Sequence, residues 1–148
     1  MRVYFDPSFL ISLYLPEPLS SQARSFVDRL AAPILVNELQ EFEFKNSVRQ
    51  KIVRHEITEP ALARCLRVFE DDCVLEKLQR KSVIWSVVYA KAERLSRRLA
   101  TQRICRSFDL LHVAIAVVSE VKQFATLDEK QSAVAEAAGL RVITLPKS

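Results

Sequence analysis

Four acidic residues stand where a sheet of parallel strands would bring their side chains together. Asp6 and Asp128 each follow a short β-prone run, and Asp109 lies in the first turn of a strongly apolar helical segment. Glu43 lies in the helix that follows another short strand. Because the carboxyl ends of parallel strands share one edge of a sheet, we expect these four carboxylates to converge on one pocket.

Ionised carboxylates so close together would need a cation. Two of them about 5 Å apart repel by about 3 kcal/mol at an effective dielectric constant of about 20, so four would strain a domain of ordinary stability. Either some stay protonated or a divalent cation lies among them, and all-oxygen ligands favour Mg²⁺ or Mn²⁺ over Zn²⁺. Such a cation can polarise a phosphoryl oxygen and activate water, so the pattern indicates hydrolysis of a phosphodiester.

Each acid also has a purely structural explanation. Asp6 and Asp128 are suited to be helix N-caps, and Glu43 alone would be an ordinary solvated helix residue. Asp109 is harder to explain in this way, because nine of the eleven residues from Phe108 to Val118 are apolar and an ionised side chain in a buried helix needs a reason.

His112 lies one turn after Asp109 on the same helix face. One interpretation is a core histidine that is hydrogen-bonded to Asp109 or to a backbone carbonyl. The other is a residue that orients the acid or touches a substrate phosphate.

The order of predicted elements favours an α/β fold with a parallel sheet, since parallel neighbours need helical crossovers. The strands are expected at 3–5, 33–36, 123–127 and 141–145, and the helices at about 7–14, 20–30, 38–54, 58–71, 83–99, 108–120 and 129–138. Asn37 with Gln40 predicts a capping box, Ser107 an N-cap, and Gly139 a helix end. The segment 73–83 has no clear pattern.

Length and composition narrow the class of protein. The 148 residues suffice for one domain, with 49% hydrophobic and 27% charged residues and a net charge of +4. No apolar run is long enough to cross a membrane, and the first residues lack a signal peptide, so a cytoplasmic location is expected. Three cysteines without a C-x-x-C pair suggest neither a disulfide framework nor a zinc site, and a single glycine argues against phosphate-binding glycine loops.

The acids lie within motifs that follow one another along essentially the whole chain. The segments are Val3-Tyr-Phe-Asp6-Pro-Ser8, Glu43-Phe-Lys-Asn46-Ser, Arg106-Ser-Phe-Asp109-Leu-Leu-His112-Val-Ala114, Phe124-Ala-Thr126-Leu-Asp128-Glu and Gly139-Leu-Arg-Val-Ile143. This ordered set resembles the PIN-domain ribonucleases, and in particular the VapC-like toxins of bacterial type II toxin-antitoxin pairs.

The resemblance implies a single three-layer α/β/α PIN domain over 1–148 with a short-stranded, mainly parallel central sheet. It also implies metal-dependent cleavage of RNA, often tRNA or ribosomal RNA, a cognate antitoxin that occludes the pocket, and a homodimer. By the same resemblance, one or two Mg²⁺ or Mn²⁺ ions would be held by Asp6, Glu43, Asp109 and Asp128, with Ser8, Asn46 and Thr126 lining the site.

Two neighbours of Glu43 are rival candidates for the helical acid, namely Glu38 and Glu41. Glu43 is preferred because Asn46 follows it at one turn. Glu41, in contrast, stands four residues before Lys45, which predicts a surface ion pair between the two.

The main interpretation is therefore an endoribonuclease toxin. Alternatives are a non-catalytic PIN-like binding module, and a PIN nuclease of RNA maturation or of DNA outside toxin-antitoxin systems. Arg97, Arg98, Arg103 and Arg106 crowd together before the apolar helix. Arg103 and Arg106 are candidates for contact with RNA phosphates, although a solvated basic face is the equal alternative.

Overall fold

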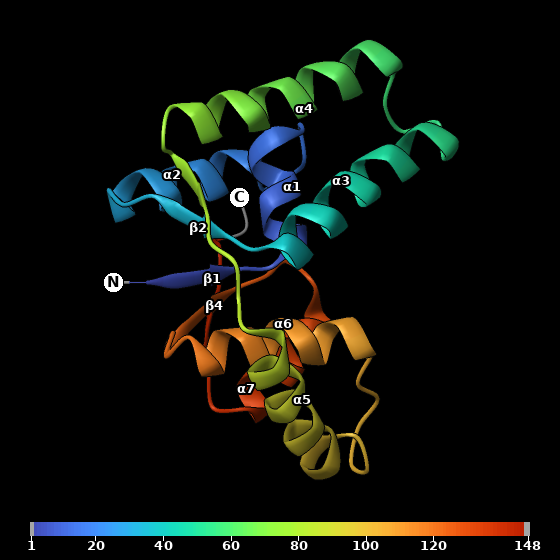
Figure 1. Ribbon diagram of the computed structural model, residues 1–148. Helices are drawn as coiled ribbons and strands as arrows, with labels where there is room; N and C mark the ends of the chain where they lie inside the picture. The colour runs from blue at the N-terminus through green and yellow to red at the C-terminus, as the bar shows by residue number, and fades with distance from the viewer. Residues whose placement is uncertain (1, 147–148) are drawn as a thin grey trace. The chain divides into compact units, whose positions relative to one another are not determined.

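The computed structural model describes residues 2–146, which form two compact units. The β1 unit comprises residues 2–6 and 83–144, and the β2 unit comprises residues 7–82 with 145–146. Each unit contains its own small parallel sheet with helices packed against it (Figure 1). The predicted α/β class with short parallel strands is thus confirmed.

The β1 unit is built on a three-stranded sheet in the order β1-β4-β5. Its strands are β1 (Val3–Phe5), β4 (Gln123–Ala125) and β5 (Arg141–Ile143), and its helices are α5 (Trp85–Leu99), α6 (Ser107–Val118) and α7 (Glu129–Ala137). All pairings are parallel, and Phe5 stands opposite Ala125. Strand β4 ends at Ala125, earlier than predicted, because the chain turns there.

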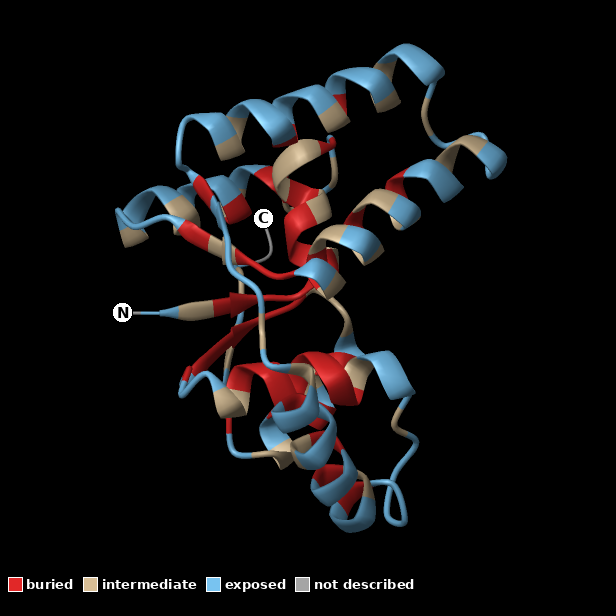
Figure 2. Ribbon diagram, viewed as in Figure 1, coloured by how far each residue is buried: buried red, intermediate tan, exposed pale blue. Residues whose placement is uncertain are grey.

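Helix α6 is the hydrophobic centre of the β1 unit. Every residue from Leu110 to Ala116 is buried, as expected for so apolar a helix (Figure 2). The predicted cap is wrong, because the helix begins at Ser107 and its N-cap is Arg106, whose side chain makes no capping hydrogen bond. None of the helices formed by residues 2–146 has both the length and the apolar character that crossing a bilayer demands.

The β2 unit pairs two parallel strands and packs four helices around aromatic side chains. The strands are β2 (Ile34–Val36) and β3 (Leu78–Arg80), and the helices are α1 (Pro7–Tyr14), α2 (Ser20–Leu30), α3 (Glu38–Val53) and α4 (Glu59–Val74). Phe44 and Phe69 stack with ring centroids 4.9 Å apart, and Tyr14 packs against both. This cluster joins α1, α3 and α4.

Strand β3 is the element that the sequence did not predict. Its three residues contain one apolar side chain, Leu78, so the local pattern resembles a loop. The strand forms because it pairs with β2, which places the buried Leu78 beside Ile34. Long-range pairing outweighs the weak local preference.

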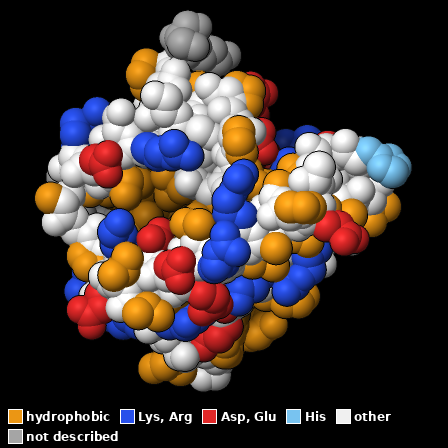
Figure 3. Space-filling view, turned by 90° about the horizontal axis from the view of Figure 1, so that it is seen from above, with side chains coloured by type: hydrophobic (Ala, Val, Ile, Leu, Met, Phe, Trp, Pro, Cys, Tyr) orange, Lys and Arg blue, Asp and Glu red, His pale blue; other side chains and the backbone are white. Residues whose placement is uncertain are grey.

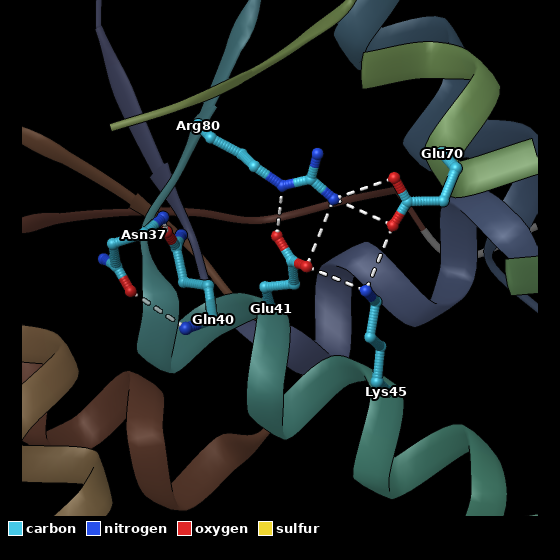
Figure 4. Close-up of polar contacts among 6 residues, drawn as sticks. All are labelled: Asn37, Gln40, Glu41, Lys45, Glu70 and Arg80. Carbon is cyan, nitrogen blue, oxygen red and sulfur yellow. Dashed lines mark hydrogen bonds and ion pairs between the residues drawn. The ribbon is translucent and has the colours of Figure 1, made fainter. Parts of the chain in front are cut away.

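An ion-pair network connects α3, α4 and β3 (Figure 4). Lys45 Nζ lies 2.8 Å from Glu41 Oε2, which confirms the predicted pair, and also 3.1 Å from Glu70 Oε1. Arg80 donates from Nε to Glu41 Oε1 at 2.7 Å and from Nη2 to both oxygens of Glu70. Two carboxylates are therefore neutralised by two cations.

Helix α3 begins with the predicted capping box. The Gln40 backbone N–H donates to Asn37 Oδ1 at 2.9 Å, and the Asn37 backbone N–H donates to Gln40 Oε1 at 2.8 Å (Figure 4). Both residues are buried. Thr58 caps α4 with one longer bond of 3.3 Å at an exposed position.

Replacing Asn37 by alanine should therefore destabilise the protein more than replacing Thr58. We expect Asn37→Ala to lower the free energy of unfolding by about 1–2 kcal/mol and Thr58→Ala by about 0.5 kcal/mol. Only Asn37→Ala disrupts a buried capping box. Urea unfolding of both variants measures the difference. Equal losses would show that the buried box contributes no more than a single exposed cap.

Candidate active site

Asp6 and Asp128 lie beyond the carboxyl ends of neighbouring strands, as predicted. The Asp6 backbone N–H donates to the Ala125 carbonyl at 2.9 Å, which continues the pairing of β1 with β4 by one residue. Asp6 is only 7% exposed. Asp128 follows β4 after Thr126 and Leu127 and caps α7, since its Oδ1 accepts from the backbone N–H groups of Lys130 and Gln131. The capping explanation of Asp128 is confirmed, and it leaves Oδ2 for other contacts.

Thr126 links the two acids through its hydroxyl group. Thr126 Oγ1 donates to Asp6 Oδ2 at 3.2 Å and accepts from the Asp128 backbone N–H at 3.1 Å. The residue is buried, so these bonds are shielded from water. Thr126 thus fixes the Asp6 carboxylate against the turn that carries Asp128.

Gln131 holds the third acid against this pair. Its Nε2 donates to Asp6 Oδ1 at 3.3 Å and to the backbone carbonyl of Asp109 at 3.2 Å. The role of Gln131 was not predicted from the sequence. The available signal was the spacing Asp128-x-x-Gln131, which is typical of a capping box, but here the glutamine side chain reaches Asp6 instead.

Arg106 bridges the two more exposed acids. Its Nε donates to Asp109 Oδ2 at 2.7 Å, and its Nη2 donates to Asp128 Oδ2 at 2.8 Å. The arginine side chain is 55% exposed, whereas that of Asp109 is 14% exposed. The guanidinium is therefore a cation at the solvent side of the acids.

The two bridged acids titrate in opposite directions. Burial raises the pKa of Asp109 above its ordinary value, and the charges of Asp128 and Asp6 add to this, so the raised value persists despite Arg106. Burial also acts to raise the pKa of Asp128, but the hydrogen bonds from Arg106 and from the α7 backbone N–H groups hold it below its ordinary value. Of these two acids, Asp109 is the one whose negative charge is less well compensated.

His112 lies in α6 and its side chain is almost fully buried, with 1% exposure. Its Nδ1 is hydrogen-bonded to Tyr4 Oη at 2.7 Å, and Tyr4 in turn stacks on Phe124. The contact joins α6 to β1 one turn after Asp109. This placement suits a residue that orients the helix carrying the acid.

The remaining predicted site residues, Ser8, Glu43 and Asn46, belong to the β2 unit. Their convergence with the three aspartates stays a prediction. Glu41, the alternative to Glu43 as the helical acid, forms ion pairs with Arg80 and Lys45. The contacts with Arg80 and Lys45 lower the pKa of Glu41 despite its partial burial.

Figure 3 shows that both basic and acidic side chains are exposed at the surface. Arg103 is exposed and donates to the Ala133 carbonyl at 3.4 Å. Of the two arginines predicted to contact RNA, only Arg106 is seen to contact the aspartates directly.

A family model of the PIN domain matches residues 3–137, which is most of the chain. The chain belongs to the PIN domain family. The recognition based on the motifs is therefore confirmed. Curated protein sequences yield no match.

Three solved structures resemble this chain in fold. VapC20 of Mycobacterium tuberculosis, a toxin that cleaves the sarcin-ricin loop, matches with a TM-score of 0.70 and 14% identity over 97% of this chain and 99% of its own. VapBC2 of Rickettsia felis, solved with a DNA fragment from its promoter, matches with a TM-score of 0.73 and 14% identity over 99% of this chain and 100% of its own. FitAcB of Neisseria gonorrhoeae matches with a TM-score of 0.63 and 13% identity over 97% of both chains. At these identities the likeness establishes the fold.

The oxygen atoms of the site residues in this PIN domain are suitable ligands for a divalent cation such as Mg²⁺ or Mn²⁺. Asp6, Asp109 and Asp128 offer carboxylate oxygens, and Thr126 and Gln131 add neutral ones. Among residues 2–146, however, no three His, Cys, Asp or Glu side chains form a ready-made metal site. Arg106 contacts one oxygen of Asp109 and one of Asp128, so its guanidinium would compete with a cation for these two acids.

The raised pKa of Asp109 predicts a pH-dependent effect of Asp109→Asn in the metal-free protein. An acid with a raised folded pKa contributes most to stability below its unfolded pKa, and this contribution is lost as the pH rises through the folded pKa. The variant avoids that loss, so near neutral pH it should be more stable than wild type in EDTA. Urea unfolding at acidic and neutral pH measures the effect.

Asp128→Asn is the matched control, because the pKa of Asp128 is lowered. Its contribution is present above the unfolded pKa and disappears as the pH falls through the folded pKa, so this variant should lose stability near neutral pH. A destabilised Asp109→Asn would instead mean that Asp109 acts mainly as a favourable charge in the first turn of α6.

Proposed function

We propose that this PIN domain is a Mg²⁺- or Mn²⁺-dependent endoribonuclease and the toxin of a toxin-antitoxin pair. The observation that carries the proposal is that Arg106 bridges Asp109 and Asp128, while Gln131 links Asp6 to the backbone of Asp109, near the strand ends of the β1 unit. Family membership supports nuclease chemistry.

The aspartates would hold the cation, together with Glu43 in the β2 unit. The bound cation would supply Lewis-acid chemistry, by neutralising phosphate charge and making an attacking water more acidic. Thr126 and Gln131 keep the Asp6 carboxylate oriented, and α7 keeps Asp128 oriented through its capping bonds. Such fixed ligands lower the reorganisation needed to reach the transition state.

Arg106 would bind the substrate backbone. Its guanidinium already contacts two carboxylates through charged hydrogen bonds, and the same fork matches a phosphate. On binding, Arg106 would exchange its carboxylate partners for a phosphate of the RNA. His112 would act indirectly by holding α6 on β1 through Tyr4.

Structured RNA is the proposed substrate, with tRNA and ribosomal RNA as the leading classes. The sarcin-ricin loop cleavage attributed to VapC20 supports the ribosomal class, and the VapBC2 and FitAcB structures support an antitoxin partner. We expect the toxin to form a homodimer and to act in the cytoplasm. A non-catalytic PIN module is the alternative, but such a module has no need to keep these aspartates together.

Activity should require both the metal and individual acids. EDTA should abolish cleavage of RNA, and Asp128→Asn should lower the rate by about 10²-fold, because the amide still caps α7 but carries no charge. Glu129→Gln, at the next and exposed position, is the matched control and should cleave like wild type. Cleavage ends mapped on total cellular RNA measure activity and reveal the substrate.

Full activity in excess EDTA would contradict the metal-dependent mechanism. Loss of activity in Glu41→Gln but not in Glu43→Gln would instead move the helical acid to Glu41. Metal-stimulated cleavage of DNA but not RNA would support the alternative of a PIN nuclease outside toxin-antitoxin systems.

Arg106→Gln should affect cation and RNA binding in opposite directions. Losing a competing exposed ion pair should tighten Mn²⁺ binding by about two- to fivefold, whereas losing a phosphate contact should weaken RNA binding and reduce its salt dependence by about one counterion. Arg103→Gln is the control, since Arg103 contacts a backbone carbonyl and not the acids. Unchanged Mn²⁺ and RNA affinities would make Arg106 a solvated surface residue.

A further inference from the structure

Gln131 is the most deeply buried polar side chain among the contacts of the acids, with 0% exposure. Its carboxamide nitrogen donates to a carboxylate oxygen of Asp6 and to the backbone carbonyl of Asp109. Both of these partners are acceptors only, so the amide orientation is fixed. Turning the amide over would place oxygen against oxygen at both contacts.

The fixed orientation leaves the other end of the amide unsatisfied. Oε1 of Gln131 is a buried atom that has no hydrogen-bond partner among residues 2–146. A buried acceptor without a donor costs about 1–3 kcal/mol, so buried polar atoms are rarely left in this state. This oxygen belongs to the same planar amide group whose nitrogen contacts Asp6 and the backbone of Asp109.

We propose that Gln131 is a positioning residue of the cation site, whose Oε1 accepts a hydrogen bond from a water of the hydrated divalent cation. The inference rests on the proposed function. Mg²⁺ keeps several waters when it binds to proteins, and these waters are strong donors. One amide would then serve two groups, with its nitrogen orienting Asp6 and its oxygen orienting the hydrated ion.

This role differs from that of a simple structural link. A link between α7, β1 and α6 would require only the nitrogen, and it would leave the oxygen unsatisfied whether or not a cation is bound. A residue of the cation site is satisfied only in the loaded protein. Removing its oxygen should therefore weaken cation binding in addition to any change in the metal-free protein.

The test measures Mn²⁺ affinity rather than cleavage. Free Mn²⁺ is followed by its electron paramagnetic resonance signal, and the thermal shift on Mn²⁺ addition is recorded in parallel. Gln131→Met has a side chain of similar length without either polar atom, and its Mn²⁺ dissociation constant should rise by about tenfold or more. Gln131→Glu keeps an oxygen acceptor but loses the donor to Asp6, so it should bind Mn²⁺ more tightly than Gln131→Met, which lacks both polar atoms.

Gln22 in α2 provides a matched control, because its Oε1 is likewise buried without a partner among the described residues. Gln22 lies in α2 and is not among the residues proposed to hold the cation, so Gln22→Met should bind Mn²⁺ like wild type. The comparison separates loss of an unsatisfied buried oxygen in general from loss of this oxygen beside the acids.

The outcomes are distinct for each claim. Wild-type Mn²⁺ affinity in Gln131→Met would overturn the role of Gln131 and leave the proposed function intact. If Gln131→Met does not fold, Gln131→Ala removes the same two polar atoms, and wild-type Mn²⁺ affinity in that variant would overturn the role equally. Absence of any Mn²⁺ binding by the wild-type protein would overturn the metal-dependent function, and the role of Gln131 with it.

Discussion

The geometry of the acids depends on the parallel pairing of β1 with β4. This register sets Phe5 opposite Ala125, and the hydrogen bond from the Asp6 N–H to the Ala125 carbonyl carries the pairing one residue further. Asp6 is therefore held beside Thr126, and the hydroxyl of Thr126 fixes the turn to Asp128. Because a shift of one residue would turn every side chain of β1 to the opposite face, the acids can meet in this register only.

Asp128 caps α7 and contacts Arg106 at the same time, through different carboxylate oxygens. One carboxylate oxygen caps α7 by accepting two backbone N–H groups, and the other contacts Arg106. Capping fixes the direction of the second oxygen and stabilises its charge, which agrees with the lowered pKa of this acid. Asp109 has no comparable set of donors and is more buried, so the cost of its charge is higher.

Local signals predicted most of the fold and part of the site. The burial of α6, the capping box at Asn37 and the strand-end positions of Asp6 and Asp128 follow from hydrophobic pattern, cap chemistry and topology, which are local or general rules. Strand β3 was missed because its pairing with β2 comes from distant residues. The contact of Gln131 with Asp6 was missed for the same reason, since 125 residues separate the two, and the contact of Arg106 with Asp128 spans 22 residues.

Neutralisation of the acids differs between the two units, and this difference bears on function. In the β2 unit, Glu41 and Glu70 are matched by Lys45 and Arg80, so the network is electrically complete. In the β1 unit, Asp109 and Asp128 share the guanidinium of Arg106, which leaves one formal negative charge when both acids are ionised. A divalent cation in place of Arg106 would neutralise both carboxylates. A purely structural cluster would be expected to resemble the balanced network of the β2 unit, and the β1 unit does not.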